Sequence, residues 1–162
     1  MTLPIAQLLE ISHEEANHQL VAFGHRMGGL RRPPEYGLWC HALVSDCRVI
    51  AVTAASTLIR DHVGGGLSHL TRLNTVELSR LCAARPGLCR PMLRLWRELV
   101  FPTLGYANAI SYQDSVMHTG NVYRFDGWAR SPRRSRSGTD ARTNTKGRDK
   151  WIWVWPPAAA AA

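Results

Sequence analysis

Apolar residues follow a helix-like spacing in some segments of the chain and a strand-like alternation in others. A short apolar run at residues 8–11, which could be a first strand, precedes Ser12, and Glu15 stands three positions after that serine. Serine followed at this distance by glutamate is a capping-box pattern, so a helix is expected to start there. Gly24 is expected to end it.

Two β-rich runs follow, at residues 37–44 and 47–55, and only Ser45 and Asp46 separate them. So short a connection between two such runs predicts an antiparallel hairpin. Residues 75–82 alternate between apolar and polar side chains, which predicts a third strand with one buried face.

A second helix is predicted to start at Pro91, because the first helical position needs no N–H group. Its predicted buried stripe is Met92, Leu93, Trp96, Leu99 and Val100. Residues 107–112 then form a predicted short strand. A strand, helix and strand of these lengths favour a parallel crossover.

The pattern changes after Trp128. In residues 129–150, apolar side chains recur at neither the helix-like nor the strand-like spacing. This predicts an extended segment that is mobile or ordered by a partner. Tryptophan alternates with β-branched residues over 151–155, which predicts a strand that returns to the sheet and buries one face. Residues 156–162 are a Pro/Ala tail. The predicted fold is therefore α/β (α+β), a single domain over residues 1–155 with a mixed central sheet flanked by helices.

The composition excludes several classes of protein. Of 162 residues, 45% are hydrophobic, as expected for one globular domain. No apolar run is long enough to span a membrane, and the start of the chain lacks the features of a secretion signal, so a cytoplasmic location is expected. The cysteines, Cys40, Cys47, Cys82 and Cys89, are spaced too widely for a typical zinc site and are expected to be reduced thiols, although a Cys/His metal site stays open.

The net charge of +8 is concentrated in one part of the chain. Residues 124–150 contain nine Lys or Arg against three Asp. A localised positive field favours an anionic partner such as nucleic acid, and a basic surface without a partner is the alternative. The loop at residues 25–34 is also basic, and it could line a substrate cleft.

Several polar residues between residues 75 and 128 are candidates for chemistry. Asp114 is predicted to end a strand, where α/β sheets place ligands, so it could act as a base or only cap the following turn. Tyr123 could donate a proton, stack on a base or simply pack under a turn. His118 could titrate near neutral pH or only hydrogen-bond within a turn. Glu77 and Arg80 could equally form a structural ion pair.

The predicted order of elements resembles the GNAT-type acyltransferase fold. This resemblance implies a donor of the acyl-CoA type, with its pyrophosphate bound by N–H groups at the start of the central helix. The corresponding residues in this chain are Arg85, Gly87 and Arg90, and Gly87 is what remains of the usual glycine-rich signature.

Three motifs, at residues 77–81, 111–114 and 120–128, resemble the Mom family of phage DNA-modification enzymes. The resemblance implies transfer of a carbamoylmethyl-type group to the exocyclic amine of adenine in duplex DNA, which protects the DNA from restriction. The catalytic residues that it implies are Asp114, Tyr123, His118 and Ser111. The DNA-contacting residues are expected in the early loop, the strands and the basic segment: His25, Arg31, Arg32, Glu77, Arg80, Tyr112, Arg124, Arg130, Arg133, Arg134 and Arg136.

Two other functions stay open. One is a GNAT-like N-acyltransferase acting on a protein, an RNA or a small amine, and the other is a non-catalytic basic module that binds nucleic acid. No metal-ligand set is predicted, although His25 and His118 leave iron open. A homodimer is also left open. If a phage or mobile element encodes the chain, the expected location is the cytoplasm of the host cell.

Overall fold

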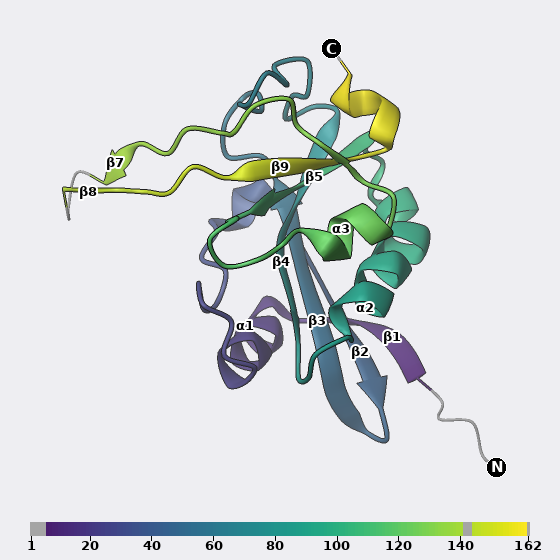
Figure 1. Cartoon of the computed structure of the whole chain (residues 1–162). Coiled ribbons are helices and arrows are strands. Elements are labelled where there is room, and N and C mark those ends of the chain that lie inside the picture. The colour runs from purple at the N-terminus through teal and green to yellow at the C-terminus, as the bar shows by residue number, and fades with distance from the viewer. Residues whose placement is uncertain (1–5, 141–143, 162) are drawn as a thin grey trace. The chain divides into compact units, whose positions relative to one another are not determined.

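The computed structural model describes residues 6–140 and 144–161 (Figure 1), and the chain divides into two units. The first unit consists of Met1–Thr57 and Glu77–Gly105, and the second of Leu58–Val76 and Tyr106–Ala162. Within the described parts of the chain, no helix is long and apolar enough to cross a membrane.

The sheet of the first unit contains β1 (Ala6–Ile11), β2 (Leu38–Ser45), β3 (Arg48–Thr57) and most of β4 (Thr75–Ala83), in that order. The pairs β1–β2 and β2–β3 are antiparallel, which confirms the predicted hairpin. Its turn consists of Asp46 and Cys47, both with positive φ, as a two-residue hairpin loop of the I′ type requires.

The helix α1 (His13–Ala22) starts as the sequence predicts. The Ser12 hydroxyl accepts a hydrogen bond of 3.1 Å from the Glu15 N–H group, which satisfies one unpaired donor of the first turn. Leu20 is fully buried and packs against β2 and β3. A short 3₁₀ turn, η1 (Pro34–Tyr36), leads from the following loop into β2.

The helix α2 (Cys89–Leu95) starts two residues before the predicted Pro91 and continues as a π-helical turn, η2 (Trp96–Val100), and a 3₁₀ turn, η3 (Phe101–Leu104). Pro91 therefore lies in the first turn, where its missing N–H group is still harmless. The prediction for Leu99 was wrong, because its side chain is 57% exposed. The π turn adds residues to the helical repeat, which moves Leu99 off the apolar stripe.

The sheet of the second unit contains β5 (Asn108–Gln113), β9 (Trp151–Trp155) and β6 (Ala129–Arg130), all antiparallel, with β9 in the middle. The predicted strand at β9 is confirmed, but it buries both faces rather than one. Ile152 and Val154 join a core with Ile110 and the loop at residues 58–74, whereas Trp153 stacks on Tyr123.

Two segments contain regular structure that the sequence pattern did not predict. The polar loop before Trp128 includes a one-turn helix, α3 (Asn121–Phe125), because Gly120 adopts a left-handed conformation and turns the chain into it. The described part of the basic segment forms an antiparallel arm with β7 (Thr139–Asp140) and β8 (Thr145–Lys146). The chain then ends in a 3₁₀ turn, η4 (Pro157–Ala160).

Candidate functional site

A buried polar network in the first unit contains two of the predicted DNA-contacting residues. Arg32 donates to Glu77 at 2.8 Å and to the Ser79 hydroxyl at 3.3 Å, and the Arg32 and Glu77 side chains are only 7% and 12% exposed. Ser79 also donates to Glu77 and contacts the buried Ser56 hydroxyl at 3.2 Å. A buried charge without a counterion strongly destabilises the folded state, so each of these charges depends on the other. The ion pair therefore holds the loop at residues 25–34 against β4.

The partner of Glu77 is therefore Arg32 and not Arg80, contrary to the ion pair suggested by sequence proximity. Arg80 instead donates to the Gly28 carbonyl at 3.3 Å and to the Ser79 carbonyl at 2.8 Å. Burial lowers the pKa of its guanidinium, and the nearby Glu77 opposes that shift. Arg31 is exposed, and His25 accepts a weak hydrogen bond from the Met27 N–H group.

The residues of the predicted donor site lie at and just before the start of α2. The N-cap residue, Leu88, makes no side-chain hydrogen bond, so no side chain of its own caps this helix end. Arg85 and Arg90 are exposed on either side of Gly87. A Cβ atom at Gly87 would meet nothing within 4 Å. This end of α2 can accept an anionic group by N–H donors and two nearby cations.

Tyr123 and Ser111, both predicted to be catalytic, lie together in the second unit. Their hydroxyl groups are 2.8 Å apart, and the residues are 8% and 3% exposed. The Tyr123 ring stacks on Trp153 and meets the edge of Trp128. The pair is thus a rigid hydroxyl dyad in an aromatic environment.

Gln113 supports this dyad, a role that its place in the motif did not reveal. It accepts a hydrogen bond of 2.7 Å from the Trp153 indole and donates one of 2.5 Å to the His118 carbonyl. A Cβ atom on Gly120 would lie 2.6 Å from the Gln113 amide oxygen, so only glycine fits there. The side chain of His118 itself lies at an exposed position.

Asp114 follows β5 and caps the next turn. One carboxylate oxygen accepts a hydrogen bond of 3.0 Å from the Val116 N–H group, and the other pairs with Arg148 at 3.0 Å. The Asp114 side chain is 18% exposed. This geometry supports the capping role left open by the sequence, and its catalytic role stays a prediction.

The arginines of the basic segment fall into two groups. Arg130 and Arg134 lie over the Trp151 ring, at 4.2 Å and 5.2 Å from its centroid. Arg133 and Arg136 line a pocket with Arg60 and a run of glycines at residues 64–66, and Arg134 also contributes to its lining. Nothing in the sequence pattern indicated that Arg60 and these glycines would lie beside the basic segment.

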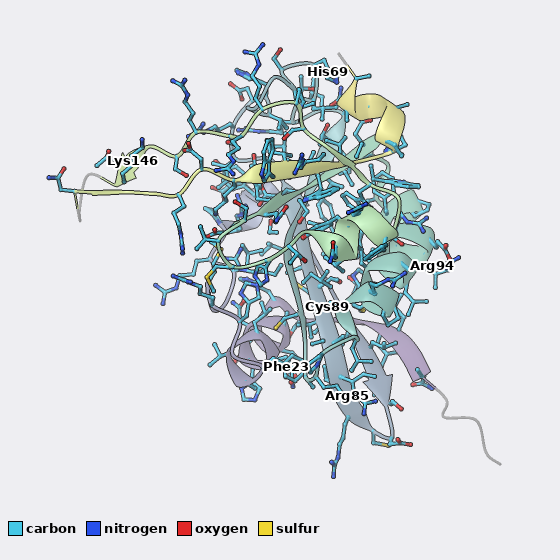
Figure 2. All side chains as sticks on the ribbon, viewed as in Figure 1. Phe23, His69, Arg85, Cys89, Arg94 and Lys146 are labelled. Atoms are coloured by element: carbon cyan, nitrogen blue, oxygen red, sulfur yellow. The ribbon has the colours of Figure 1, made fainter. Side chains whose placement is uncertain are left out.

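Two predicted DNA contacts lie outside both groups. The partly buried Tyr112 packs against the hydrophobic core of the second unit, and Arg124 is exposed on α3, 6.0 Å from the centre of the Phe125 ring. Figure 2 shows every described side chain, including Lys146 on the arm and Cys89 at the start of α2.

No cysteine in the described chain forms a disulfide, in agreement with the prediction of free thiols. Burial raises the pKa of Cys40 and that of Cys89 to about 11, so both stay protonated at neutral pH and are poor nucleophiles. Burial lowers the pKa of His41. Among residues 6–140 and 144–161, no three His, Cys, Asp or Glu side chains gather as a metal site would need.

Comparison with solved structures identifies the fold. A mutant of the spermidine N-acetyltransferase SpeG from Vibrio cholerae aligns over 97% of this chain and 96% of its own, with a TM-score of 0.64 and 6% identity. The aminoglycoside acetyltransferase AAC(6')-Ib, in complex with paromomycin and acetyl-CoA, covers 95% and 94% at a TM-score of 0.60 and 12% identity. A protein from Desulfovibrio desulfuricans described as a GNAT-family acetyltransferase covers 93% and 98% at a TM-score of 0.58 and 12% identity.

The chain has the fold of the GNAT acetyltransferases. This confirms the fold class expected from the order of predicted elements. No protein-family model matches the chain, and no curated protein matches it in sequence. The narrower resemblance to the Mom family is not tested by these matches and stays a prediction.

Proposed function

We propose that this protein is an N-acyltransferase that transfers an acyl group from acyl-CoA to an amine. The observation that carries the proposal is the GNAT fold. A spermidine acetyltransferase and an aminoglycoside acetyltransferase have this fold, and their structures align with nearly the whole of this chain. One of these structures contains acetyl-CoA.

The residues at the start of α2 fit the phosphate groups of such a donor. The helix end lacks a side-chain cap, the space beside Gly87 is open, and Arg85 and Arg90 supply positive charge. When bound, acyl-CoA would supply an activated thioester. Arg85 and Arg90 are the residues that we assign to holding its phosphates.

Tyr123 is our candidate proton donor. Its hydroxyl is 2.8 Å from that of Ser111, its ring packs against Trp128 and Trp153, and the residue is only 8% exposed. A phenol held in this way would donate its proton to the CoA thiolate that leaves when the amine takes the acyl group, without first reorganising solvent. Ser111 acts through Tyr123, as a positioning residue.

Calorimetric titration with coenzyme A tests the donor site. Wild-type protein should bind it, and Arg85→Ala/Arg90→Ala should bind at least about 10-fold more weakly, because each lost arginine–phosphate contact removes on the order of 1 kcal/mol. Arg94→Ala is the matched control, since Arg94 is an exposed arginine on the same helix. Equal affinity in all three proteins would remove the assignment.

DNA adenine is a second candidate acceptor, favoured by the arginines of the basic segment. In this version the exocyclic amine of adenine takes the place of a small amine, and the Mom-like motifs at residues 77–81, 111–114 and 120–128 motivate it. Mass spectrometry of nucleosides from cells that express the protein should then reveal a modified adenine. If the DNA of cells with active protein is unmodified, the small amine is the remaining candidate acceptor.

A further inference from the structure

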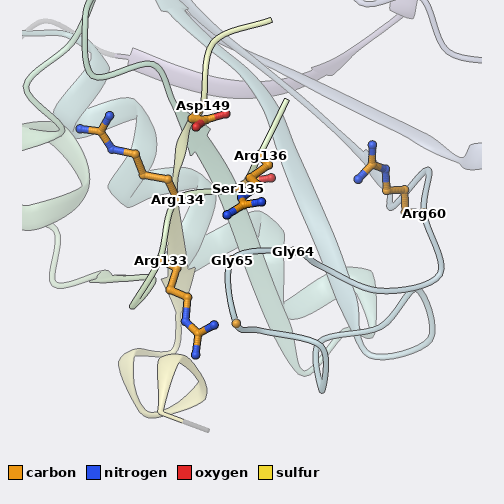
Figure 3. A pocket seen from close by; sticks show the side chains of 9 residues that line it. Arg60, Gly64, Gly65, Arg133, Arg134, Ser135, Arg136 and Asp149 are labelled. Atoms are coloured by element: carbon orange, nitrogen blue, oxygen red, sulfur yellow. The ribbon is translucent and has the colours of Figure 1, made fainter. Parts of the chain in front are cut away.

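The second unit contains a pocket of about 560 Å³ with an unusual lining. Four arginines and one aspartate contribute to it, so positive charge dominates. The residues come from three places in the chain: the loop after β3, the start of the basic segment more than sixty positions later, and Asp149 near the end of that segment. Figure 3 shows Arg133 and Arg136 beside the glycine loop, with Arg134 extending to the other side.

Glycine allows the loop after β3 and the start of the basic segment to meet at backbone distance. Gly65 has φ of +70°, and a Cβ atom there would lie 2.8 Å from the Arg133 carbonyl oxygen. A Cβ atom on Gly66 would lie 3.3 Å from the Pro132 ring. Side chains at these positions would push the arginine segment away, so the glycines determine the shape of the pocket.

The arginine segment is itself held firmly on its other side. The buried Ser131 hydroxyl donates to the Arg133 carbonyl at 2.8 Å and accepts from the Ile152 N–H group at 3.1 Å. Ser135 and Lys150 exchange two backbone hydrogen bonds of 2.8 Å and 3.1 Å. The wall of the pocket is thus fixed by β9 and the arm rather than by a ligand.

Three of the four arginines in the pocket lining have no partner among the described residues. Within the described chain, the guanidinium groups of Arg60, Arg133 and Arg136 form no ion pair or hydrogen bond with another residue. Asp149 accepts a hydrogen bond of 3.0 Å from the Ser137 N–H group. Three cations that surround one space repel each other, so an anion that enters it would be stabilised by all of them.

We propose that this pocket binds a phosphate group, carried by a nucleic-acid strand or by a small polyphosphate. An arginine guanidinium can donate two parallel hydrogen bonds to two oxygens of one phosphate group. A pocket with several arginines and one carboxylate can bind phosphate in this way through more than one arginine. The volume exceeds the need of one phosphate, so adjacent groups of the same ligand also fit. Arg130, which lies over Trp151 beside Arg134, extends the positive surface beyond the pocket for a longer ligand.

The site is defined by binding and does not require the proposed acyl transfer. Arg60→Ala/Arg136→Ala removes two cations that form no ion pair or hydrogen bond with another described residue. Fluorescence anisotropy would follow a labelled duplex oligonucleotide, its single strand and, by competition, tripolyphosphate. On a duplex, each lost phosphate contact lowers the slope of log affinity against log salt by about 0.9, so the double variant should lose up to about 1.8.

Arg48→Ala/Arg94→Ala is the matched control, because it removes the same charge from exposed positions in the first unit. It should keep the wild-type slope, and both variants should melt like wild type. A strand-bound ligand predicts loss of oligonucleotide binding, and a small ligand predicts loss of tripolyphosphate binding alone.

Three outcomes would overturn the site. The first is an equal slope change in both double variants, which would mean that only net charge matters. The second is competition by poly-L-glutamate as strong as that by phosphate at equal charge. The third is no binding of any phosphate probe by wild-type protein.

Discussion

Arginine has opposite roles in two regions of this protein. In the first unit Arg32 is enclosed, and its charge is balanced by Glu77 at 2.8 Å. In the second unit Arg60, Arg133 and Arg136 surround a pocket of about 560 Å³ without an internal carboxylate partner. One guanidinium holds the structure together, whereas the others stay available for a ligand.

The difference shows that a sequence of basic residues does not reveal which arginines can bind an anion. Arg32 was grouped with Arg133 and Arg136 as a DNA contact because all three lie in basic loops. Burial separates them, because an enclosed charge with its counterion has little attraction left for a ligand, whereas an exposed unpaired one retains it. Mutations in the first region should therefore change stability, whereas mutations in the second should change anion binding.

The largest effect on stability is expected for Arg32→Met. It leaves Glu77 buried without its cation, and such a break costs about 3–5 kcal/mol of unfolding free energy. Urea denaturation of wild type and variant would measure it. The double variant Arg32→Met/Glu77→Leu removes both charges and should recover most of the loss, whereas a double variant as unstable as the single one would show that the pair is not the cause.

A smaller effect on stability is expected for Asp114→Asn. The Asp114–Arg148 pair is partly exposed on the Arg148 side, at 41%, so its loss should cost less than about 1 kcal/mol. If Asp114 is catalytic, as the Ser111–Asp114 motif suggests, this folded variant should lose transfer activity. Full activity in a variant with a wild-type melting curve would leave Asp114 only its capping role.

The smallest effect on stability is expected for Arg133→Ala/Arg134→Ala/Arg136→Ala. These side chains are exposed, so the melting temperature should hardly change. The slope of log DNA affinity against log salt should fall by up to about three, if all three contact phosphate. A large drop in melting temperature would instead mean that the arginines stabilise the fold of the segment. An unchanged slope would mean that these arginines do not contact DNA phosphates.

Local patterns predicted much of the fold. The capping box at Ser12, the hairpin and the alternation over residues 151–155 each depend on neighbours in sequence, and each prediction is confirmed. The predictions failed where the outcome depends on distant contacts. Leu99 is exposed because the helix widens into a π turn. Strand β9 buries both faces because the loop at residues 58–74 packs on one of them and Tyr123 stacks on the other.

The candidate sites were predictable only in part. Ser111 and Tyr123 were named from their motifs, and the structure brings their hydroxyls together at 2.8 Å. Gln113 was missed as their support because its contacts to Trp153 and His118 join residues up to forty positions apart. The pocket of Arg60 was missed for the same reason, since its glycine loop meets the basic segment only in three dimensions.

Transfer of label from radiolabelled acetyl-CoA tests the central claim most directly. The protein would be incubated with spermidine, with kanamycin and with duplex DNA, and the label on each acceptor counted. We expect label on at least one of these amines, and a large loss of transfer in Tyr123→Phe, which retains the ring but not the hydroxyl. Folded wild-type protein that binds coenzyme A and labels none of the acceptors would contradict the account.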